Sequence, residues 1–117
     1  GLQNHNDFFT TGDEVISIVG AVNSSWLGLI VDTGSFRVHD PYEEIAKCAP
    51  LAVNWQVKEK LFVNGTEVDA DIQKIIDIVK ASPYSGYLPI ETLGEGDPKV
   101  KVKALYGKLM QALGNDH

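Results

Sequence analysis

Two segments of the chain place apolar side chains at the spacing of an amphipathic helix. In the first, residues 12–23, Thr11 or Asp13 is a candidate N-cap, and Asp13 and Glu14 favour the positive end of the helix dipole. The second segment is residues 69–81. Both repeat apolar positions at i, i+3, i+4 and i+7, which are Val15, Ile18, Val19 and Val22 in the first and Ile72, Ile75, Ile76 and Val79 in the second. The pattern therefore predicts two helices, each with one buried face.

Two other segments are predicted as helices from the residues at their ends. In both, an aspartate suited to the N-cap precedes a proline suited to the first helical turn. The segments are residues 40–50, with Asp40 and Pro41, and residues 94–114, with Asp97 and Pro98.

Short apolar runs between these helices predict strands at residues 27–32, 51–57 and 86–91, and the beginning of the chain supplies part of a further strand. An Asn-Gly pair predicts a turn at residues 63–67. Strands alternating with helices indicate an α/β fold of four βα units, with parallel strands and right-handed crossovers. The pattern contains no linker, so residues 1–117 are interpreted as a single unit.

Composition narrows the function classes. The chain has 117 residues, of which 44% are hydrophobic, enough to bury the core of one domain. Its net charge of −6 argues against a nucleic acid as partner, because that binding depends on clustered lysine and arginine. Cys48 is the one cysteine, which excludes an internal disulfide. No apolar stretch has the length of a membrane span, and no leader peptide begins the sequence, so we expect a cytoplasmic protein without membrane contact.

Polar residues stand at the end of every predicted strand, about one βα unit apart. In parallel α/β folds, loops at the carboxyl ends of the strands form the mouth of the site, so these residues are expected to meet there. They are Gln3, Asn4 and His5 after the first strand, Asp32 after the second, Gln56, Lys58 and Glu59 at the third, and Glu91 at the fourth.

Four stretches in this order resemble a known family: LQNHNDF, LIVDTGSFRVHDPYEEIAKCAP, VNWQVKEK and GYLPIETLGEGDP. They are similar to the last four strands of sugar phosphate isomerases/epimerases of the xylose isomerase-like TIM-barrel superfamily. The resemblance covers essentially the whole chain. It implies the C-terminal half of a TIM (β/α)8 barrel, a fold of typically about 250 residues, and therefore a fragment of a longer protein.

The resemblance also implies a divalent metal, such as Mn²⁺, Mg²⁺, Co²⁺ or Zn²⁺, held by Glu, Asp, His and Glu from four consecutive strands. Such an ion would polarise sugar oxygens while carboxylates move a proton between adjacent carbons. Asp32 matches the metal-binding Asp, and Glu91 matches the last Glu, which is both a metal ligand and a proton carrier. Gln3 stands in place of the first Glu and Gln56 in place of the His. Lys58 corresponds to a lysine of the family pattern.

Because an amide cannot act as a base near neutral pH, a two-base epimerisation through Gln3 and Glu91 is not available. The expected function is a sugar phosphate isomerase/epimerase-like activity: proton transfer on a sugar or keto-sugar, assisted by a divalent metal, with one-base transfer or elimination as the available chemistry. The alternative is a non-catalytic carbohydrate-binding or degenerate scaffold relative that has lost its metal ligands. If the protein is an enzyme, we expect the full-length protein to be active and this half alone to be inactive.

The remaining site residues each have a plainer alternative. Lys58 is expected to be catalytic, by neutralising an oxyanion or, less favoured, by carrying a Schiff base, or else simply to pair with Glu59 or Glu91. Arg37 would bind a phosphate or carboxylate of the substrate, or form a surface salt bridge. Gln3, His5 and Gln56 are expected substrate-binding residues, with structural hydrogen bonding as the alternative.

The expected ligand is a small sugar or sugar phosphate. A half barrel leaves two parallel sheet edges unpaired. We therefore expect a homo-oligomer or association with the missing half barrel.

Overall fold

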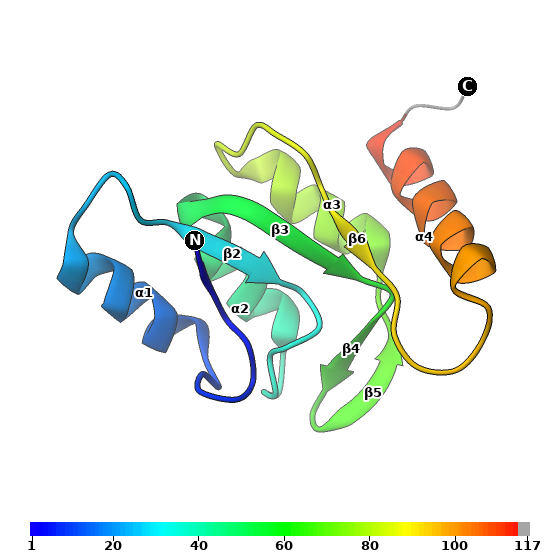
Figure 1. The fold of residues 1–117 in the computed structure, drawn as a ribbon, viewed down its shortest axis with the longest axis horizontal. Coiled ribbons are helices and arrows are strands. Elements are labelled where there is room, and N and C mark those ends of the chain that lie inside the picture. Colours follow the sequence, from blue (N-terminus) through cyan, green and yellow to red (C-terminus); the bar gives the residue numbers. More distant parts are fainter. Residues whose placement is uncertain (115–117) are drawn as a thin grey trace.

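The computed structural model describes residues 1–114, in which strands and helices alternate along the chain except at three consecutive strands before the third helix (Figure 1). The helices are α1 (Gly12–Val22), α2 (Pro41–Cys48), α3 (Ile72–Ala81) and α4 (Pro98–Leu113), with one 3-10 turn, η1 (Ala49–Leu51). The strands are β1 (Leu2–Gln3), β2 (Leu29–Asp32), β3 (Ala52–Lys58), β4 (Lys60–Val63), β5 (Thr66–Asp69) and β6 (Ile90–Glu91).

Four of the strands form one parallel sheet in the order β1-β2-β3-β6, with β1 and β6 at its edges. The register pairs Gln3 with Ile30, Asp32 with Gln56, and Lys58 with Glu91. The α/β fold class with four parallel strands is therefore confirmed. The register also brings the carboxyl ends of all four strands to the same edge of the sheet.

Capping residues determine where the helices begin, because their side chains accept hydrogen bonds from free N–H groups of the first turn. Thr11, rather than Asp13, caps α1: its hydroxyl accepts from the Glu14 N–H, and the Glu14 carboxylate accepts from the Thr11 N–H in return. Asp40 caps α2 and Asp97 caps α4, each before a proline. Every predicted helix is present, with boundaries that differ from the expectation by a few residues.

A second, two-stranded antiparallel sheet lies between β3 and α3, where the sequence predicts only a turn. Strands β4 and β5 pair from Lys60–Asp69 to Val63–Thr66. Asn64 and Gly65 connect them, with positive φ values of 51° and 80°. Two consecutive residues with positive φ close a tight hairpin whose twist suits the flanking strands. The turn prediction is confirmed, and its extension into a hairpin was not foreseen.

Strand β6 is shorter than the predicted strand at residues 86–91. Pro89 has no N–H to give to a ladder, although its carbonyl still accepts from the Val57 N–H at 2.8 Å. The chain enters the sheet only at Ile90, and Glu91 is the residue that β6 presents at its carboxyl end.

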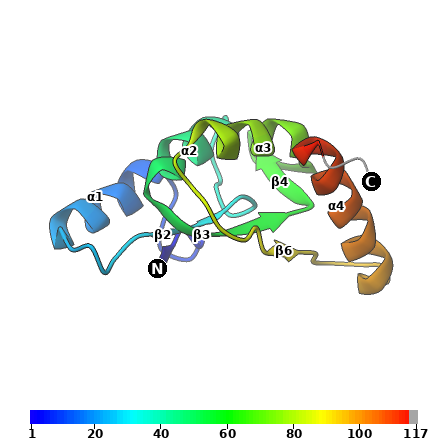
Figure 2. The ribbon, with the colours of Figure 1, turned by 90° about the horizontal axis from the view of Figure 1, so that it is seen from above.

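The hydrophobic core fills the space between the sheet and the helices. Figure 2 shows α2 and α3 on one side of the strands. The strands contribute Leu29, Val31, Trp55 and Val57 to this core, each at most 1% exposed, and the helices contribute Val15, Ile45, Ile75 and Ile76. Within residues 1–114, no helix combines the length and apolar character needed to cross a membrane.

Candidate functional site

The carboxylate of Asp32, at the end of β2, is completely buried and surrounded by donors. Its Oδ2 accepts hydrogen bonds from Gln3 Nε2 at 3.0 Å, Ser35 Oγ at 2.6 Å and Lys58 Nζ at 3.0 Å. Its Oδ1 accepts from the Gly34 N–H at 3.0 Å. A buried charge without such partners would be strongly destabilising, so these contacts allow the carboxylate to remain in the interior.

Asn4 fixes the backbone of Asp32. Its amide nitrogen donates to the Asp32 carbonyl at 2.9 Å, and its amide oxygen accepts from the Asp32 N–H at 2.8 Å. The side chain thereby extends the hydrogen bonding between β1 and β2 beyond the last paired residue. Asn4 is 2% exposed, and both of its bonds determine where Asp32 stands.

Lys58, at the end of β3, connects Asp32 to Glu91 at the end of β6. Its ammonium lies 3.0 Å from Asp32 Oδ2 and 3.5 Å from Glu91 Oε2. Gln56 Nε2 also donates to Glu91 Oε2, at 2.9 Å. Gln3, Asp32, Gln56, Lys58 and Glu91 thus form one continuous set of polar contacts across all four parallel strands, which we call the strand-end network.

The loop after β2 determines the path of the Lys58 side chain. A Cβ atom on Gly34 would lie 2.5 Å from Lys58 Cδ and 2.9 Å from the Lys60 carbonyl oxygen. Thr33 holds the strand beside it, because its hydroxyl accepts from the Lys58 N–H at 3.0 Å. The glycine in the DTG stretch therefore makes room for the lysine that joins the two carboxylates.

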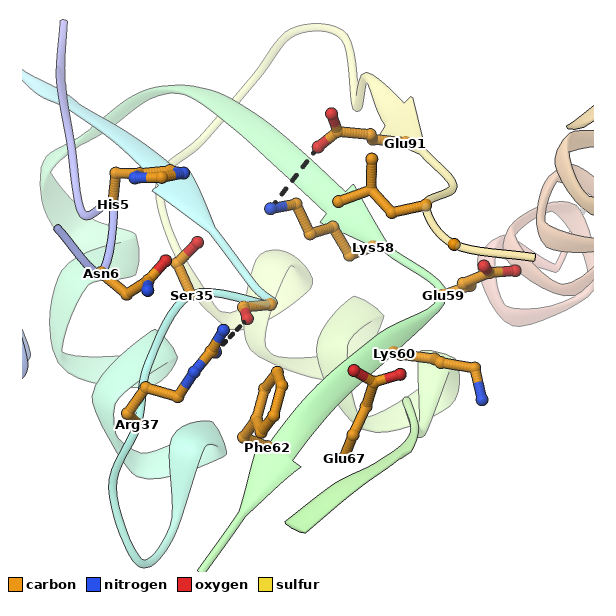
Figure 3. Close-up of a pocket in the computed structure, with 13 residues that line it drawn as sticks. His5, Asn6, Ser35, Arg37, Lys58, Glu59, Lys60, Phe62, Glu67 and Glu91 are labelled. Carbon is orange, nitrogen blue, oxygen red and sulfur yellow. Dashed lines mark hydrogen bonds and ion pairs between the residues drawn. The ribbon is translucent and has the colours of Figure 1, made fainter. Parts of the chain in front are cut away.

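A cavity of about 250 Å³ opens beside Lys58 and Glu91. Figure 3 shows Lys58 extending toward Glu91, with Phe62 and Glu67 of the hairpin on another wall. A volume of this size is slightly below the range of ordinary small-molecule pockets. The hairpin therefore does more than connect β3 to α3, because it forms part of the cavity wall.

His5 and Arg37 line the same cavity without joining the strand-end network. The His5 ring nitrogen Nδ1 lies 2.9 Å from Asp7 Oδ2, and both side chains are at least half exposed. Arg37 donates to the Gly34 carbonyl at 2.8 Å, and its guanidinium lies 3.4 Å from the centre of the Phe62 ring. Both are therefore anchored at the edge of the cavity, where a ligand could contact them.

The structure brings together most of the residues expected in the site. Lys58, Glu91, His5 and Arg37 line the cavity, whereas Gln3, Asp32 and Gln56 bind the other members of the strand-end network. Lys58 pairs with Glu91 rather than with Glu59, whose carboxylate contacts Lys101 of α4 at 2.6 Å.

Comparison with solved structures identifies the fold. The chain superimposes on a crystal structure of a xylose isomerase domain protein from Planctomyces limnophilus with a TM-score of 0.70 and 19% sequence identity. The alignment covers 97% of this chain and 45% of that one. The chain has the fold of about half of a xylose isomerase-like TIM barrel. A scan against protein-family models found no match, and a search of curated proteins found no significant similarity.

The side chains at the mouth of this half barrel do not fit a resident divalent cation. Both carboxylates that could bind one, Asp32 and Glu91, already face the Lys58 ammonium. Gln3 and Gln56 donate their N–H groups to these carboxylates, so neither adds a further anionic ligand. Within residues 1–114 there is also no cluster of three or more His, Cys, Asp or Glu side chains arranged to hold a metal ion.

Several residues of this half-barrel site were not anticipated from the sequence. Ser35 donates the shortest bond to Asp32, and Phe62 supports Arg37. Asn4 was expected at the mouth as a strand-end residue, but its role in positioning the Asp32 backbone was not. Ser35 and Phe62 reach the site only through the loop after β2 and the hairpin, whose paths the pattern did not predict.

Proposed function

We propose that the protein carrying this chain is a sugar phosphate isomerase/epimerase-like enzyme that moves a proton at a carbon next to a carbonyl group. The observation that carries the proposal is the carboxylate of Glu91 on the cavity wall, held by Lys58 and Gln56 at the carboxyl ends of the strands. A carboxylate positioned by two donors beside a small cavity is suited to general base catalysis. The shared fold supports this proposal only as an analogy.

Each cavity residue then has a role in the proposal. Glu91 takes and returns the proton, and Lys58 stabilises the negative charge that develops on the carbonyl oxygen. His5 donates to or accepts from a substrate hydroxyl. Arg37 binds an anionic group such as a phosphate. Each of these side chains lines the cavity.

Gln3 and Gln56 are proposed to contact substrate only through their amide oxygens. Their amide nitrogens are engaged by Asp32 and Glu91, at 3.0 and 2.9 Å. The principal effect of both residues in this proposal is to hold the two carboxylates in place. One base, Glu91, therefore carries out the proton transfer, in agreement with the loss of a second carboxylate at Gln3.

The proposed activity needs a completed barrel. The chain spans 45% of the length of the solved structure that it matches, and β1 and β6 are the edges of its sheet. Exposed strand edges favour pairing with further strands. We propose that another half barrel, in the same polypeptide or in a second copy of the chain, closes the site, and that residues 1–117 alone are inactive.

The test uses the full-length protein in D₂O with a panel of aldoses, ketoses and their phosphates. Deuterium incorporation next to the carbonyl, followed by NMR, reports proton abstraction even when little product accumulates. Glu91→Gln is expected to reduce incorporation by at least a thousandfold, whereas Glu95→Gln, an exposed carboxylate outside the cavity, leaves the rate unchanged. An unchanged rate in Glu91→Gln would reject the proposed base.

The second candidate function is non-catalytic carbohydrate binding. It is favoured by the two neutral amides, Gln3 and Gln56, at positions where the resemblance implies metal ligands. Calorimetric binding of a sugar without deuterium incorporation into any member of the panel would support this function in place of catalysis.

A further inference from the structure

The Lys58 ammonium lies between two carboxylates that belong to different strands. It is 3.0 Å from Asp32 Oδ2 and 3.5 Å from Glu91 Oε2, and the lysine side chain is 14% exposed. Asp32 is completely buried. The arrangement is therefore a partly desolvated cation site that is formed by the fold and filled by a side chain of the same chain.

The donor groups around this site complement an ammonium rather than a metal ion. An ammonium has three N–H donors and no acceptor. One of them is donated to Asp32 Oδ2 at 3.0 Å, and Glu91 Oε2 lies at ion-pair distance, 3.5 Å, so the ammonium keeps donor capacity for the cavity that Lys58 lines. Gly34 keeps this position accessible, because any side chain there would collide with Lys58 Cδ.

The net charge of the side chains around Lys58 also argues against a metal site. Two carboxylates and one ammonium leave a single negative charge, with the amides of Gln3 and Gln56 adding none. A divalent ion placed between the same carboxylates would lie next to the ammonium, and two cations within about 4 Å repel each other strongly at low effective dielectric constant. A metal could enter only by displacing Lys58 from both of its partners.

We propose that Lys58 serves as a built-in cation at the mouth of the half barrel: it excludes divalent metals and binds the carbonyl or hydroxyl oxygen of the ligand directly. The identity of the ligand rests on the proposed function, but the exclusion of metals does not. The site then needs no metal ion, because the Lys58 ammonium supplies its positive charge.

The test measures Mn²⁺ binding to the full-length protein after treatment with a chelator, by the loss of the free Mn²⁺ electron paramagnetic resonance signal. The wild type is expected to show no site that depends on Glu91. Lys58→Met removes the ammonium and leaves both carboxylates, so it should bind Mn²⁺ at least tenfold more tightly than the wild type. Adding Glu91→Gln to this variant should abolish the gain.

Lys60→Met is the matched control, because Lys60 lines the same cavity but pairs with Asp69, at 3.2 Å. It removes the same charge nearby and should leave Mn²⁺ binding at the wild-type level. Where Lys58→Met does not fold, judged by circular dichroism, Lys58→Gln replaces it. A wild-type Mn²⁺ site lost in Glu91→Gln, or no gain in a folded Lys58 variant, would overturn the proposal.

Activity separates this proposal from the proposed function. Deuterium incorporation that persists within about twofold after chelation supports both. Incorporation that is lost on chelation and restored by Mn²⁺ retains the enzyme and rejects the built-in cation. A gain of Mn²⁺ binding in Lys58→Met, together with no deuterium incorporation by the wild type into any sugar of the panel, rejects the enzyme and retains the cation site.

Discussion

The two faces of the parallel sheet are made by alternate residues of the same strands, yet they differ in nearly every physical property. Val31 and Trp55 point toward the helices and are completely buried in the apolar core. Their neighbours Asp32 and Gln56 belong to the strand-end network on the other face. Burial of the first set stabilises the fold, whereas desolvation of the second set costs free energy that hydrogen bonds must offset.

This difference separates the residues of the apolar core from the candidate site residues more clearly than sequence position does. A sheet does not need a carboxylate with no exposed surface, and retaining Asp32 requires donors from the loop after β2 and from two strands, β1 and β3. Such a concentration of satisfied polar groups beside a cavity is the reason that we propose a functional site there. Substitutions on the two faces should therefore lower stability for different reasons.

Trp55→Ala should have the largest effect on stability. The indole is completely buried and packs edge to face against Tyr84, with ring centres 6.1 Å apart. Removing it leaves a large cavity and should lower the free energy of unfolding by about 3–5 kcal/mol, measured by urea denaturation. Trp55→Phe should lose less, because within residues 1–114 the indole nitrogen has no hydrogen-bond partner. Equal losses in the two variants would contradict the packing explanation.

Asp32→Asn tests the polar face at nearly constant volume. The change leaves the Lys58 ammonium without its closest carboxylate, at 3.0 Å, and should reduce the free energy of unfolding by about 3 kcal/mol. The matched control is Asp69→Asn, which removes an exposed partner of Lys60 and should cost less than about 0.5 kcal/mol. Similar small losses at both positions would show that burial of Asp32 does not strengthen its ion pair.

Gly34→Ala should destabilise through a collision with the strand-end network. Its new methyl group would stand 2.5 Å from Lys58 Cδ and 2.9 Å from a backbone oxygen, and overpacking of this kind costs about 1–3 kcal/mol. Gly20→Ala, in α1, meets no atom within 4 Å and should instead stabilise the protein by about 0.5–1 kcal/mol. Both are measured as shifts in the urea midpoint, and a gain in Gly34→Ala would refute the collision.

The smallest expected effect concerns Cys48 of α2, on the helix-covered face of the sheet, and the dependence of the free energy of unfolding on pH. Burial raises the pKa of its thiol from 9.0 to about 12. The unfolded chain therefore releases this proton first as the pH rises, so the stabilising effect is complete below pH 9 and is lost between pH 9 and 12. At pH 10 the loss relative to pH 8 should be about 1.4 kcal/mol. Cys48→Ala should remove this part of the pH dependence, and an unchanged slope would contradict the buried thiol.

Much of the fold could be predicted from local pattern. The four helices follow from apolar periodicity and from Asp-Pro starts, both of which act over a few residues. The sequence predicts the turn of the hairpin but not its strands. Asn64–Gly65 specifies a turn locally, whereas the pairing of β4 with β5 depends on contacts between the flanking residues. Strand β6 was predicted too long, since Pro89 limits the ladder.

The sequence by itself determined which residues stand at the ends of the parallel strands, because the positions of strands and helices along the chain follow from local periodicity. Gln3, Asp32, Gln56 and Glu91 could be named on that basis. Only the tertiary structure decided their contacts: Lys58 joins Asp32 and Glu91, while its neighbour Glu59 contacts Lys101. Adjacent strand residues point to opposite faces, and the partners on each face come from distant segments, so strand register and loop paths select the ion pairs.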